Sequence, residues 1–322
     1  MITVCENIDR LITVESRLPS LPRGIAHLLY YAVRSNEEPL TYQIASEMKK
    51  RIEDNRDSTF TVGIFTGVWD PKWLPNGEND GPIGAVVLGK ALYLAGAEVK
   101  FFVEKEIVPV MKALCTKLGV PATFIPLSRE DDYENESIAD ELNGAVFIEK
   151  IGPSKEGVYH FASGLARGEH HDAPLELLLN KLRDNGKVTV GIGDMGNEIG
   201  FGKIYDEARK IHPFGEICKC KNPDGLVTKL ATEYLLPSSI SNLGAYGLAA
   251  AIALLTENLD ILHKPEDELA LIHICAEMDC RDGGFGKAHH YVDGVQDRSI
   301  AAYVRLLQEM VTMYFNVEER GF

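Results

Sequence analysis

Short apolar runs rich in β-branched residues alternate with segments of helical periodicity between residues 60 and 192. Each run is long enough for a buried strand, and each intervening segment is long enough for a helix. Strands that alternate with helices in this way form a mostly parallel sheet covered on both faces. We therefore expect a three-layer, Rossmann-like α/β fold with an N-terminal arm and C-terminal helices.

The same periodicity predicts the individual elements. Pro82 and Gly96 delimit one helix, because proline suits the first helical position and glycine the end. Strands are expected at residues 60–66, 98–103, 122–125, 145–149 and 187–192, and one more within 226–236. Helices are expected at residues 23–33, 41–56, 82–96, 105–118, 135–142, 173–184, 200–211, 242–256, 266–278 and 297–315.

The first 40 residues differ from the rest, because they carry Pro19, Pro22 and Pro39 and lack the strand–helix rhythm. We interpret residues 1–40 as an arm packed on the main domain. Residues 41–322 show no internal repeat, low-complexity tract or linker, so we expect them to form a single α/β domain.

The formal net charge is −15 at pH 7, from 33 basic and 48 acidic residues. A field of this sign repels phosphate backbones and anionic lipid, and no basic run offsets it. We therefore expect no nucleic-acid partner. An anionic substrate then requires a local positive site.

No apolar run reaches the length of about 18 residues that a membrane span needs. The N-terminal residues lack a basic stretch followed by an apolar one, which a secretory signal would have. We expect no membrane association and a cytoplasmic location. The oligomeric state is left open, with a homo-oligomer among the options.

Six cysteines are present, and Cys218 and Cys220 form a CxC pair rather than CxxC. No second pair stands at zinc-binding spacing. We expect free, buried thiols in a reducing compartment.

Ligands of open α/β sheets bind beyond the carboxyl ends of the strands. The first such segment, residues 66–84, ends in Asp80 and Gly81 before a helix whose unpaired N–H groups suit an anion. Because neither GxGxxG nor GxxxxGK[ST] occurs, a substrate carboxylate fits better than a phosphate. The alternative is that Asp80 only caps its helix.

The second segment, residues 148–160, runs directly from an apolar strand into charge. Lys150 and Lys155 are candidates to clamp a substrate carboxylate, and Ser154 is a further candidate for substrate binding. Glu149 or Glu156 is a candidate to ligate metal or transfer protons. The alternative is a solvated loop.

The third segment, residues 191–202, interleaves five glycines with Asp194, Asn197 and Glu198. Hard divalent cations prefer oxygen ligands of this type. Asp194 and Glu198 would face one point if a helix started between them, so they are the candidate metal ligands. Asn197 is a candidate substrate contact, and the alternative is a turn capped by Asp194 and Asn197.

Two further segments carry candidates. Ser241 and Asn242 precede a small-residue helix and could bind substrate or merely cap it. Arg281 could pair with a carboxylate, and Asp282 could serve as a ligand or base. The alternative interpretation of the last segment is two loops closed by Asp-Gly turns.

Together these segments resemble the D-glutamate cyclase family, specifically the C-terminal domain of the eukaryotic mitochondrial enzyme, which stands alone in many bacteria. The matching stretches are NDGPIGAVVLGKALYLAGAEV (79–99), IEKIGPSKEGVYH (148–160), GDMGNEIGFG (193–202), SNLGAYGLAAA (241–251) and, more loosely, CRDGGFGKAHHYVDGV (280–295). Met195 stands where the family pattern has glycine, and the last stretch departs from Asp-Gly-Val-Thr-Gly.

The resemblance implies reversible, metal-dependent cyclisation of D-glutamate to 5-oxo-D-proline with loss of water. It implies Mn²⁺ or Mg²⁺ on Asp194 and Glu198, and no nucleotide. Lys155 or Arg281 would hold the α-carboxylate of the substrate. The candidates for the base are Glu149, Glu156 and Asp282.

Two other classes of protein are weighed against this one. A non-catalytic protein that senses an amino acid or a small acid would have the same pocket without turnover. A nicotinamide-dependent oxidoreductase is disfavoured, because no dinucleotide fingerprint follows the first strand.

Overall fold

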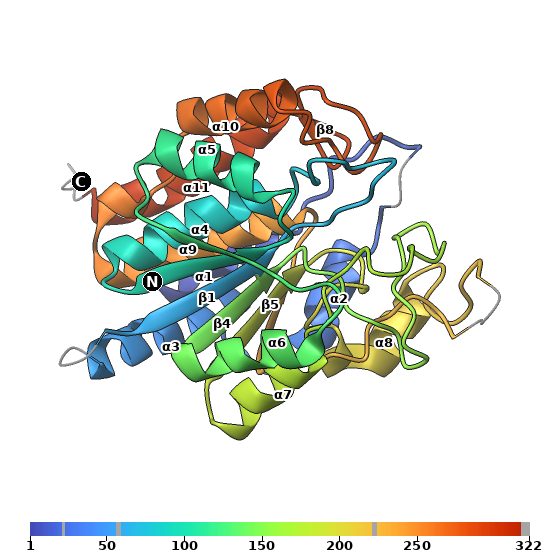
Figure 1. Cartoon of the computed structure of the whole chain (residues 1–322). Helices are drawn as coiled ribbons and strands as arrows, with labels where there is room; N and C mark the ends of the chain where they lie inside the picture. The colour runs from blue at the N-terminus through green and yellow to red at the C-terminus, as the bar shows by residue number, and fades with distance from the viewer. Residues whose placement is uncertain (21–22, 56–58, 221–223, 317–322) are drawn as a thin grey trace.

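The computed structural model describes residues 1–20, 23–55, 59–220 and 224–316. Its central sheet has six parallel strands in the order β3-β2-β1-β4-β5-β6 (Figure 1). Helices cover both faces, so the prediction of a three-layer α/β fold is confirmed. The strands are β1 (Thr61–Thr66), β2 (Glu98–Val103), β3 (Thr123–Pro126), β4 (Gly144–Ile148), β5 (Val188–Gly193) and β6 (Tyr234–Pro237).

The strand order reverses between β1 and β4, which are neighbours in the sheet although two strands separate them in the chain. Thr66 lies opposite Ile148 at the carboxyl end of this pair. The chain leaves β1 and β4 in different directions at this point, and a crevice opens between the two departing loops.

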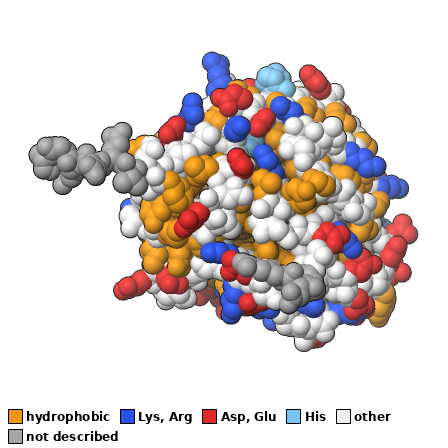
Figure 2. Space-filling model, turned by 90° about the vertical axis from the view of Figure 1, so that its left-hand side faces the viewer, with side chains coloured by type: hydrophobic (Ala, Val, Ile, Leu, Met, Phe, Trp, Pro, Cys, Tyr) orange, Lys and Arg blue, Asp and Glu red, His pale blue; other side chains and the backbone are white. Residues whose placement is uncertain are grey.

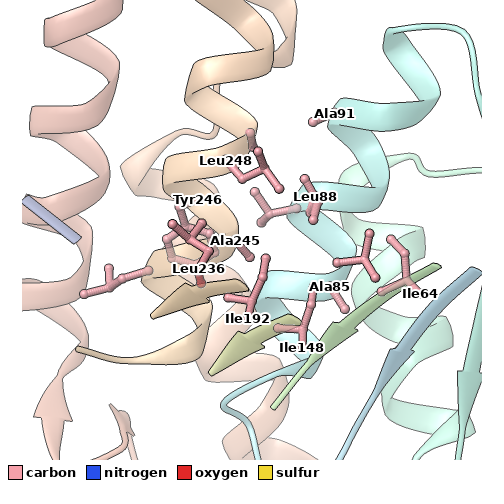
Figure 3. Packing of buried hydrophobic residues seen from close by; sticks show 14 of the residues in the cluster. Ile64, Ala85, Leu88, Ala91, Ile148, Ile192, Leu236, Ala245, Tyr246 and Leu248 are labelled. Carbon is pink, nitrogen blue, oxygen red and sulfur yellow. The ribbon is translucent and has the colours of Figure 1, made fainter. Parts of the chain in front are cut away.

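Two helices, α4 (Pro82–Leu94) and α9 (Ser241–Thr256), cover the first face of the sheet and pack closely against each other. Figure 3 shows Ile64, Ile148 and Ile192 of the strands meeting Ala85 of α4 and Ala245 of α9. Burying a side chain such as isoleucine contributes about 1.5–3 kcal/mol to the stability of the fold. The layer is extended by α3 (Leu40–Asp54) beside α9 and by α5 (Val108–Leu118) beside α4.

The second face has its own core, centred on three phenylalanines. The ring of Phe65 stacks on Phe102 and Phe147 at centroid distances of 4.6 and 4.8 Å. This face is covered by α6 (Asp132–Ser137), the 3-10 helix η1 (Ile138–Glu141) and α7 (Glu176–Asp184). Beyond β5 the chain forms η2 (Gly202–Ile204) and α8 (Tyr205–Ile211), and α2 (Ala26–Val33) packs beside β6 and α8.

Three helices form a further layer on the first face, namely α1 (Ile2–Ile12), α10 (Pro265–Glu277) and α11 (Asp297–Phe315). The sequence analysis missed α1, although Cys5, Ile8 and Ile12 form a buried stripe along it. Its first residue has no side-chain cap, so it lacks the usual signal of a helix start. The remaining elements are η3 (Leu259–Ile261) and a hairpin of β7 (Tyr291–Val292) and β8 (Val295–Gln296).

The N-terminal segment is anchored by the buried carboxylate of Asp9. It accepts hydrogen bonds from Tyr30 Oη at 2.5 Å, from the N–H of Leu40 at 2.7 Å and from Thr41. Because Pro39 offers no side-chain cap, Asp9 caps α3 from another helix. The segment therefore packs firmly, while its division from a domain at residue 41 stays a prediction.

The outer surface mixes side chains of all kinds. Figure 2 shows the left-hand side of Figure 1, where acidic and basic groups are interspersed with hydrophobic ones. Among the helices of the described ranges, none has both the length and the apolar character that crossing a membrane requires.

The N-termini of α4 and α9 cap each other across the first face. Asp80 accepts the N–H groups of Ser241 and Asn242 at 3.1 and 2.7 Å. In return, Asn242 Oδ1 accepts the N–H groups of Gly81 and Gly84 at 2.9 and 2.7 Å. Capping was the expected alternative for Asp80 and Asn242, and each residue caps the other helix. Asp80 also accepts the N–H of Gly81, at the start of its own helix, at 3.0 Å.

Replacing Asn242 with alanine is expected to lower the free energy of unfolding by about 1–3 kcal/mol, because the buried N–H of Gly84 would lose its acceptor. The N–H of Gly81 would keep Asp80 Oδ1 as an acceptor, at 3.0 Å. Urea denaturation measures this loss. Asn258→Ala is the matched control, since Asn258 caps only the exposed η3 through a single N–H group. A loss for Asn242→Ala no larger than the control would contradict the reciprocal capping argument.

Candidate functional site

A cavity of about 430 Å³ lies at the carboxyl end of the sheet, beside the point where the strand order reverses. This volume is within the usual range for small-molecule sites. The loops that follow β1, β4 and β5 supply most of its wall, and two later loops and the N-terminal segment complete it. Its charged and strongly polar lining residues are Arg17, Glu78, Glu149, His160, Arg167, Asp194, Asn197 and Asp293.

A second hollow of about 650 Å³ lies at the opposite end of the sheet, among the C-terminal ends of α3, α4 and α9. Its ionisable residues Lys49, Glu53 and Glu257 are at least partly exposed, so water solvates them. Although this hollow is larger, the first cavity is the one lined by buried charged side chains, among them Arg17, Glu149 and Asp194. We therefore take the first cavity as the candidate site.

Four buried carboxyl groups at this cavity have raised pKa values. Burial and the charges of neighbouring acids raise the pKa of Asp80 to about 7. The same two causes raise the pKa values of Glu78 and Glu149 well above their ordinary range. Burial also raises the pKa of Asp194, although Arg17 opposes the shift. Such a cluster carries more negative charge than its surroundings neutralise.

Glu149 follows β4 and points into the cavity. Its backbone is left-handed, with φ of 46°, which costs energy for a residue with a side chain. The hydroxyl of Ser241 donates to Glu149 Oε2 at 2.5 Å. Gly81 leaves room for it, since a Cβ there would lie 2.8 Å from Glu149 Cβ and φ is 93°. The strand end, the start of α9 and the loop before α4 thus hold one carboxyl group in place.

The loop after β5 is shaped by Glu198, whose carboxylate accepts the N–H groups of Asp194, Met195 and Gly196 at 3.1, 2.9 and 2.7 Å. No helix starts between Asp194 and Glu198, the condition under which the sequence placed them at one point, because the chain forms a tight loop there. The two carboxylates still converge, since the side chain of Glu198 folds back along its own loop.

Arg17 lies between α1 and α2 and forms ion pairs with Asp194 and Asp293. Its side chain is only 2% exposed. Burial alone would lower the pKa of Arg17, but these two carboxylates raise it further than burial lowers it. The carbonyl of Ile12 accepts the N–H and hydroxyl of Ser239 at 2.8 and 3.0 Å, which fixes the segment that carries Arg17.

Two sets of three carboxylates could hold a metal ion at this cavity. Within each set, one oxygen of every residue lies within 4.8 Å of the others. Clustered carboxylate oxygens are the donors that Mg²⁺, Mn²⁺ and Ca²⁺ prefer. The sets are Asp80, Asp194 and Asp293, and Glu149, Asp194 and Glu198.

Hydrogen-bonding groups for a ligand lie on another part of the wall. Arg167 donates to Asp172 at 2.5 Å and to the carbonyl of Trp69 at 2.6 Å, which orients its guanidinium. Asn197 donates to the carbonyl of His160 at 2.9 Å. Its buried Oδ1 has no hydrogen-bond partner among the described residues, so it remains an acceptor that a ligand could use.

Lys150 was a candidate for substrate binding, but the structure directs it away from the cavity. Its buried ammonium forms an ion pair with Glu104 and lies 3.3 Å from the carbonyl of Gly67. The left-handed backbone of Glu149, with φ of 46°, turns the chain at the end of β4, so Glu149 lines the cavity and Lys150 does not.

Ser154, Lys155 and Glu156 are also placed outside the cavity. Ser154 is buried in a tight turn, where its N–H donates to the carbonyl of Val158 at 2.9 Å. The turn projects Lys155 and Glu156 into solvent, and the Lys155 ammonium lies 3.9 Å from the ring centroid of Tyr205. The solvated-loop alternative describes these residues better than a substrate clamp.

Arg281 and Asp282 support the neighbouring loop and do not line the cavity. Arg281 donates to both carboxylate oxygens of Asp279, at 2.8 and 2.9 Å. Asp282 is fully buried and accepts the N–H groups of Gly294 and Phe285 at 2.7 and 2.9 Å. Asp282 thereby closes the loop that delivers Asp293, as the Asp-Gly turn alternative anticipated.

The sequence analysis missed four charged residues of the wall. Glu78 and Asp293 stand inside segments that it singled out, but no spacing distinguished them. A Cβ at Gly283 would lie 1.6 Å from Glu78 Oε1, so only glycine lets that loop cover the carboxylate. Arg17 and Arg167 are isolated basic residues with no pattern around them, and no local signal could have found them.

The expectation of free thiols is wrong for one pair of cysteines. Cys218 and Cys220 form a disulfide, with their Cα atoms 5.4 Å apart, within the usual range for such bonds. Cys5, Cys115, Cys275 and Cys280 are free and buried.

Comparisons with known proteins agree on one family. The sequence model described as D-glutamate cyclase-like, C-terminal, matches residues 25–308. The mitochondrial D-glutamate cyclase of Homo sapiens is 27% identical over 247 residues, which cover 72% of this chain and 36% of the human protein. The match therefore spans about a third of that relative. Arg17 lies outside the residues that the family model matches.

Replacing Glu149 with glutamine is expected to raise the thermal midpoint of the metal-free protein by a few degrees at pH 8. Folding raises the pKa of Glu149 above its ordinary value of 4.5. Protonation of Glu149 therefore contributes stability to the folded state. This contribution is fully present below pH 4.5 and is lost as the pH rises through the pKa of the folded state. Glutamine stays neutral and keeps the acceptor for Ser241.

The advantage of the glutamine variant should be smaller at pH 5 than at pH 8, because more of the wild-type carboxyl is protonated at the lower pH. Calorimetry at both pH values, in the presence of a chelator, measures the difference. Glu156→Gln, at an exposed position, should change neither midpoint. If Glu149→Gln lowered the thermal midpoint equally at both pH values, the argument that an ionised Glu149 destabilises the metal-free protein would be refuted.

Proposed function

The chain belongs to the D-glutamate cyclase-like family, and we propose that it catalyses the reversible dehydration of D-glutamate to 5-oxo-D-proline, or a closely related reaction on a small amino acid. One observation carries this proposal most strongly. Buried carboxylates and two arginines converge on a single cavity at the point where the strand order reverses. The proposed substrate is a small zwitterion with groups of both signs, which suits such a wall.

The reaction requires proton transfer and charge stabilisation, and neither oxidation nor phosphoryl transfer. The amine nitrogen forms a bond to the γ-carboxyl carbon, and one carbon–oxygen bond breaks. Two protons leave the ammonium nitrogen and depart with the oxygen as water, so the net charge of the reacting groups does not change. A site for this reaction needs a residue that can both accept and return a proton.

A divalent cation fits the carboxylate cluster, because the donor atoms are oxygens and the buried acids outnumber the arginines. The raised pKa values at Asp80, Glu149 and Asp194 are those of acids that lack a sufficient counter-charge. We propose that Asp194, with Glu149 and Glu198 or with Asp80 and Asp293, would hold Mn²⁺ or Mg²⁺. When bound, the cation would polarise the substrate carboxyl group.

Glu149 is our candidate for the proton-transfer residue. It lines the cavity, whereas Glu156 is exposed and Asp282 is engaged with its own loop. Its carboxyl group can accept a proton when ionised and return it when protonated. The hydroxyl of Ser241 fixes the orientation of the carboxyl group through a 2.5 Å hydrogen bond.

We assign recognition of the substrate α-carboxylate to Arg167, in place of Lys155 or Arg281, which lie outside the cavity. The guanidinium of Arg167 is oriented by Asp172 and lies on the wall. Asn197 adds a buried acceptor for an N–H group of the substrate. Arg17 is assigned a positioning role, since it joins Asp194 to Asp293.

The opposite wall is apolar and would limit the access of water. Val68, Leu74 and Ile151 form a small buried cluster there, and Tyr159 packs against it. Excluding water strengthens electrostatic interactions at the carboxylates and opposes rehydration of a cyclic product before release.

Purified protein is expected to interconvert D-glutamate and 5-oxo-D-proline in the presence of Mn²⁺ or Mg²⁺, as followed by chiral chromatography. Glu149→Gln and Asp194→Asn should each lower kcat/KM by about 100-fold or more, because each removes a group that acts on the reacting atoms. A chelator should abolish turnover, and the metal should restore it.

Glu156→Gln serves as the control for Glu149→Gln, because its carboxyl group is exposed in the loop that follows the same strand. Its activity should equal that of the wild type. Saturable binding of D-glutamate without product, under every metal condition, would refute catalysis and favour the sensor alternative. Turnover that persists without a metal would refute the proposed role of the cation but not the proposed reaction.

Arg17→Ala is expected to lower kcat by about 10–100-fold, since Asp194 and Asp293 would lose the cation between them. Methylguanidinium added to the variant should restore part of the activity, because it can occupy the vacated position. Arg281→Ala removes a surface guanidinium and should leave activity unchanged. Loss of activity without chemical rescue, in a variant with altered thermal stability, would indicate a purely structural role.

A further inference from the structure

A second group of potential metal-binding side chains lies beside the same cavity, whose wall it reaches through His160. It consists of His160, Cys218 and Cys220, and one ligand atom of each lies within 4.8 Å of the others. Nε2 of His160 is 3.5 Å from Sγ of Cys220. The reaction proposed above uses none of these three groups.

The backbone holds the three residues together from two distant parts of the chain. His160 pairs with Ala166 in a small antiparallel bridge that forms part of the cavity wall. The N–H of Lys219, between the two cysteines, donates to the carbonyl of Gly164 at 2.8 Å. The cysteine segment is thereby attached to the loop that carries His160.

The chemistry of this group differs from that of the carboxylates. One imidazole and two thiolates are soft donors, and a Cys₂His set with one open position is known for Zn²⁺. Burial lowers the pKa of His160, so its imidazole is neutral near pH 7 and has a lone pair for a metal. The disulfide occupies both sulfur atoms, so a metal can bind only after this bond breaks.

We propose that reduction of the Cys218–Cys220 disulfide converts this group into a site for a soft divalent cation, bound by His160 and the two thiolates. A thiol or phosphine reductant supplies two electrons, the sulfur–sulfur bond breaks, and two thiols form as the reductant is oxidised. Binding of the cation then releases the thiol protons to solvent. Cys220 is half-buried, so a reductant can reach it.

The position of the site links it to the cavity. His160 lines the wall, and its carbonyl accepts the side-chain N–H of Asn197 at 2.9 Å. A cation on His160 would therefore restrain the same loop that Asn197 contacts. The redox state and the soft metal together would regulate how this wall receives a ligand.

The test compares oxidised protein with protein reduced by a phosphine under anaerobic conditions, each titrated with Co²⁺ and then with Zn²⁺. Reduced protein should bind one additional cation per chain and show sulfur-to-cobalt charge-transfer absorption that Zn²⁺ removes. Oxidised protein should show neither change. Mass spectrometry after alkylation confirms which cysteines are reduced.

Variants separate this site from the carboxylate site. Cys218→Ser with Cys220→Ser, and separately His160→Gln, should abolish the absorption band, whereas Cys115→Ser, at another buried cysteine, should keep it. Asp194→Asn should also keep it, so failure of the proposed catalytic function would not affect this result. The proposal would be overturned if oxidised protein or the double variant bound the additional Zn²⁺ as well. It would also be overturned if protein with both thiols reduced bound no additional Zn²⁺.

Discussion

The exchange of caps between Asp80 and Asn242 is the contact on which the candidate site depends. It joins the first turns of α4 and α9, which arise from segments more than 150 residues apart in the chain, and satisfies backbone N–H groups of both helices. Helix N-termini carry partial positive charge, so this pairing also directs two such ends toward the buried acids. The start of α9 then presents Ser241 to Glu149 across the point where the strand order reverses.

In the absence of a cation, burial and mutual repulsion disfavour the ionised forms of the acids at the cavity. A bound cation would offset this cost, which is the condition that favours a cation site. Acids at the ends of three strand loops are buried close together, and their pKa values are raised because burial and mutual repulsion disfavour ionisation. Arg17 offsets part of this charge from outside the sheet. The N-terminal segment is therefore part of the site, although it precedes the residues that the family model matches.

Two groups of donor atoms lie at or beside this cavity. Oxygen donors gather at the ends of β4 and β5, and sulfur and nitrogen donors gather where residues 218–220 attach to the loop of His160. Hard and soft cations prefer these two sets respectively, so they need not compete. The loop of residues 159–167 carries His160 and joins the two regions. Its carbonyls accept the side-chain N–H of Asn197 from the loop after β5 and the N–H of Lys219 from the cysteine segment.

Sequence periodicity was sufficient to predict the parallel sheet, most helices and the segments that surround the cavity. It was insufficient for single side chains. Glu149 and Lys150 are adjacent and both charged, yet one enters the cavity and the other pairs with Glu104 behind it. Only the left-handed backbone of Glu149 at the end of β4 decides between them.

The sequence by itself thus determined the elements and the end of the sheet at which the candidate cavity lies, because hydrophobic periods and turn residues act over about 15 neighbouring positions. Tertiary structure decided which acids meet, that Arg17 joins them, and that Cys218 and Cys220 lie beside His160. These contacts join residues far apart in the chain, and their geometry follows from packing, which no local pattern encodes.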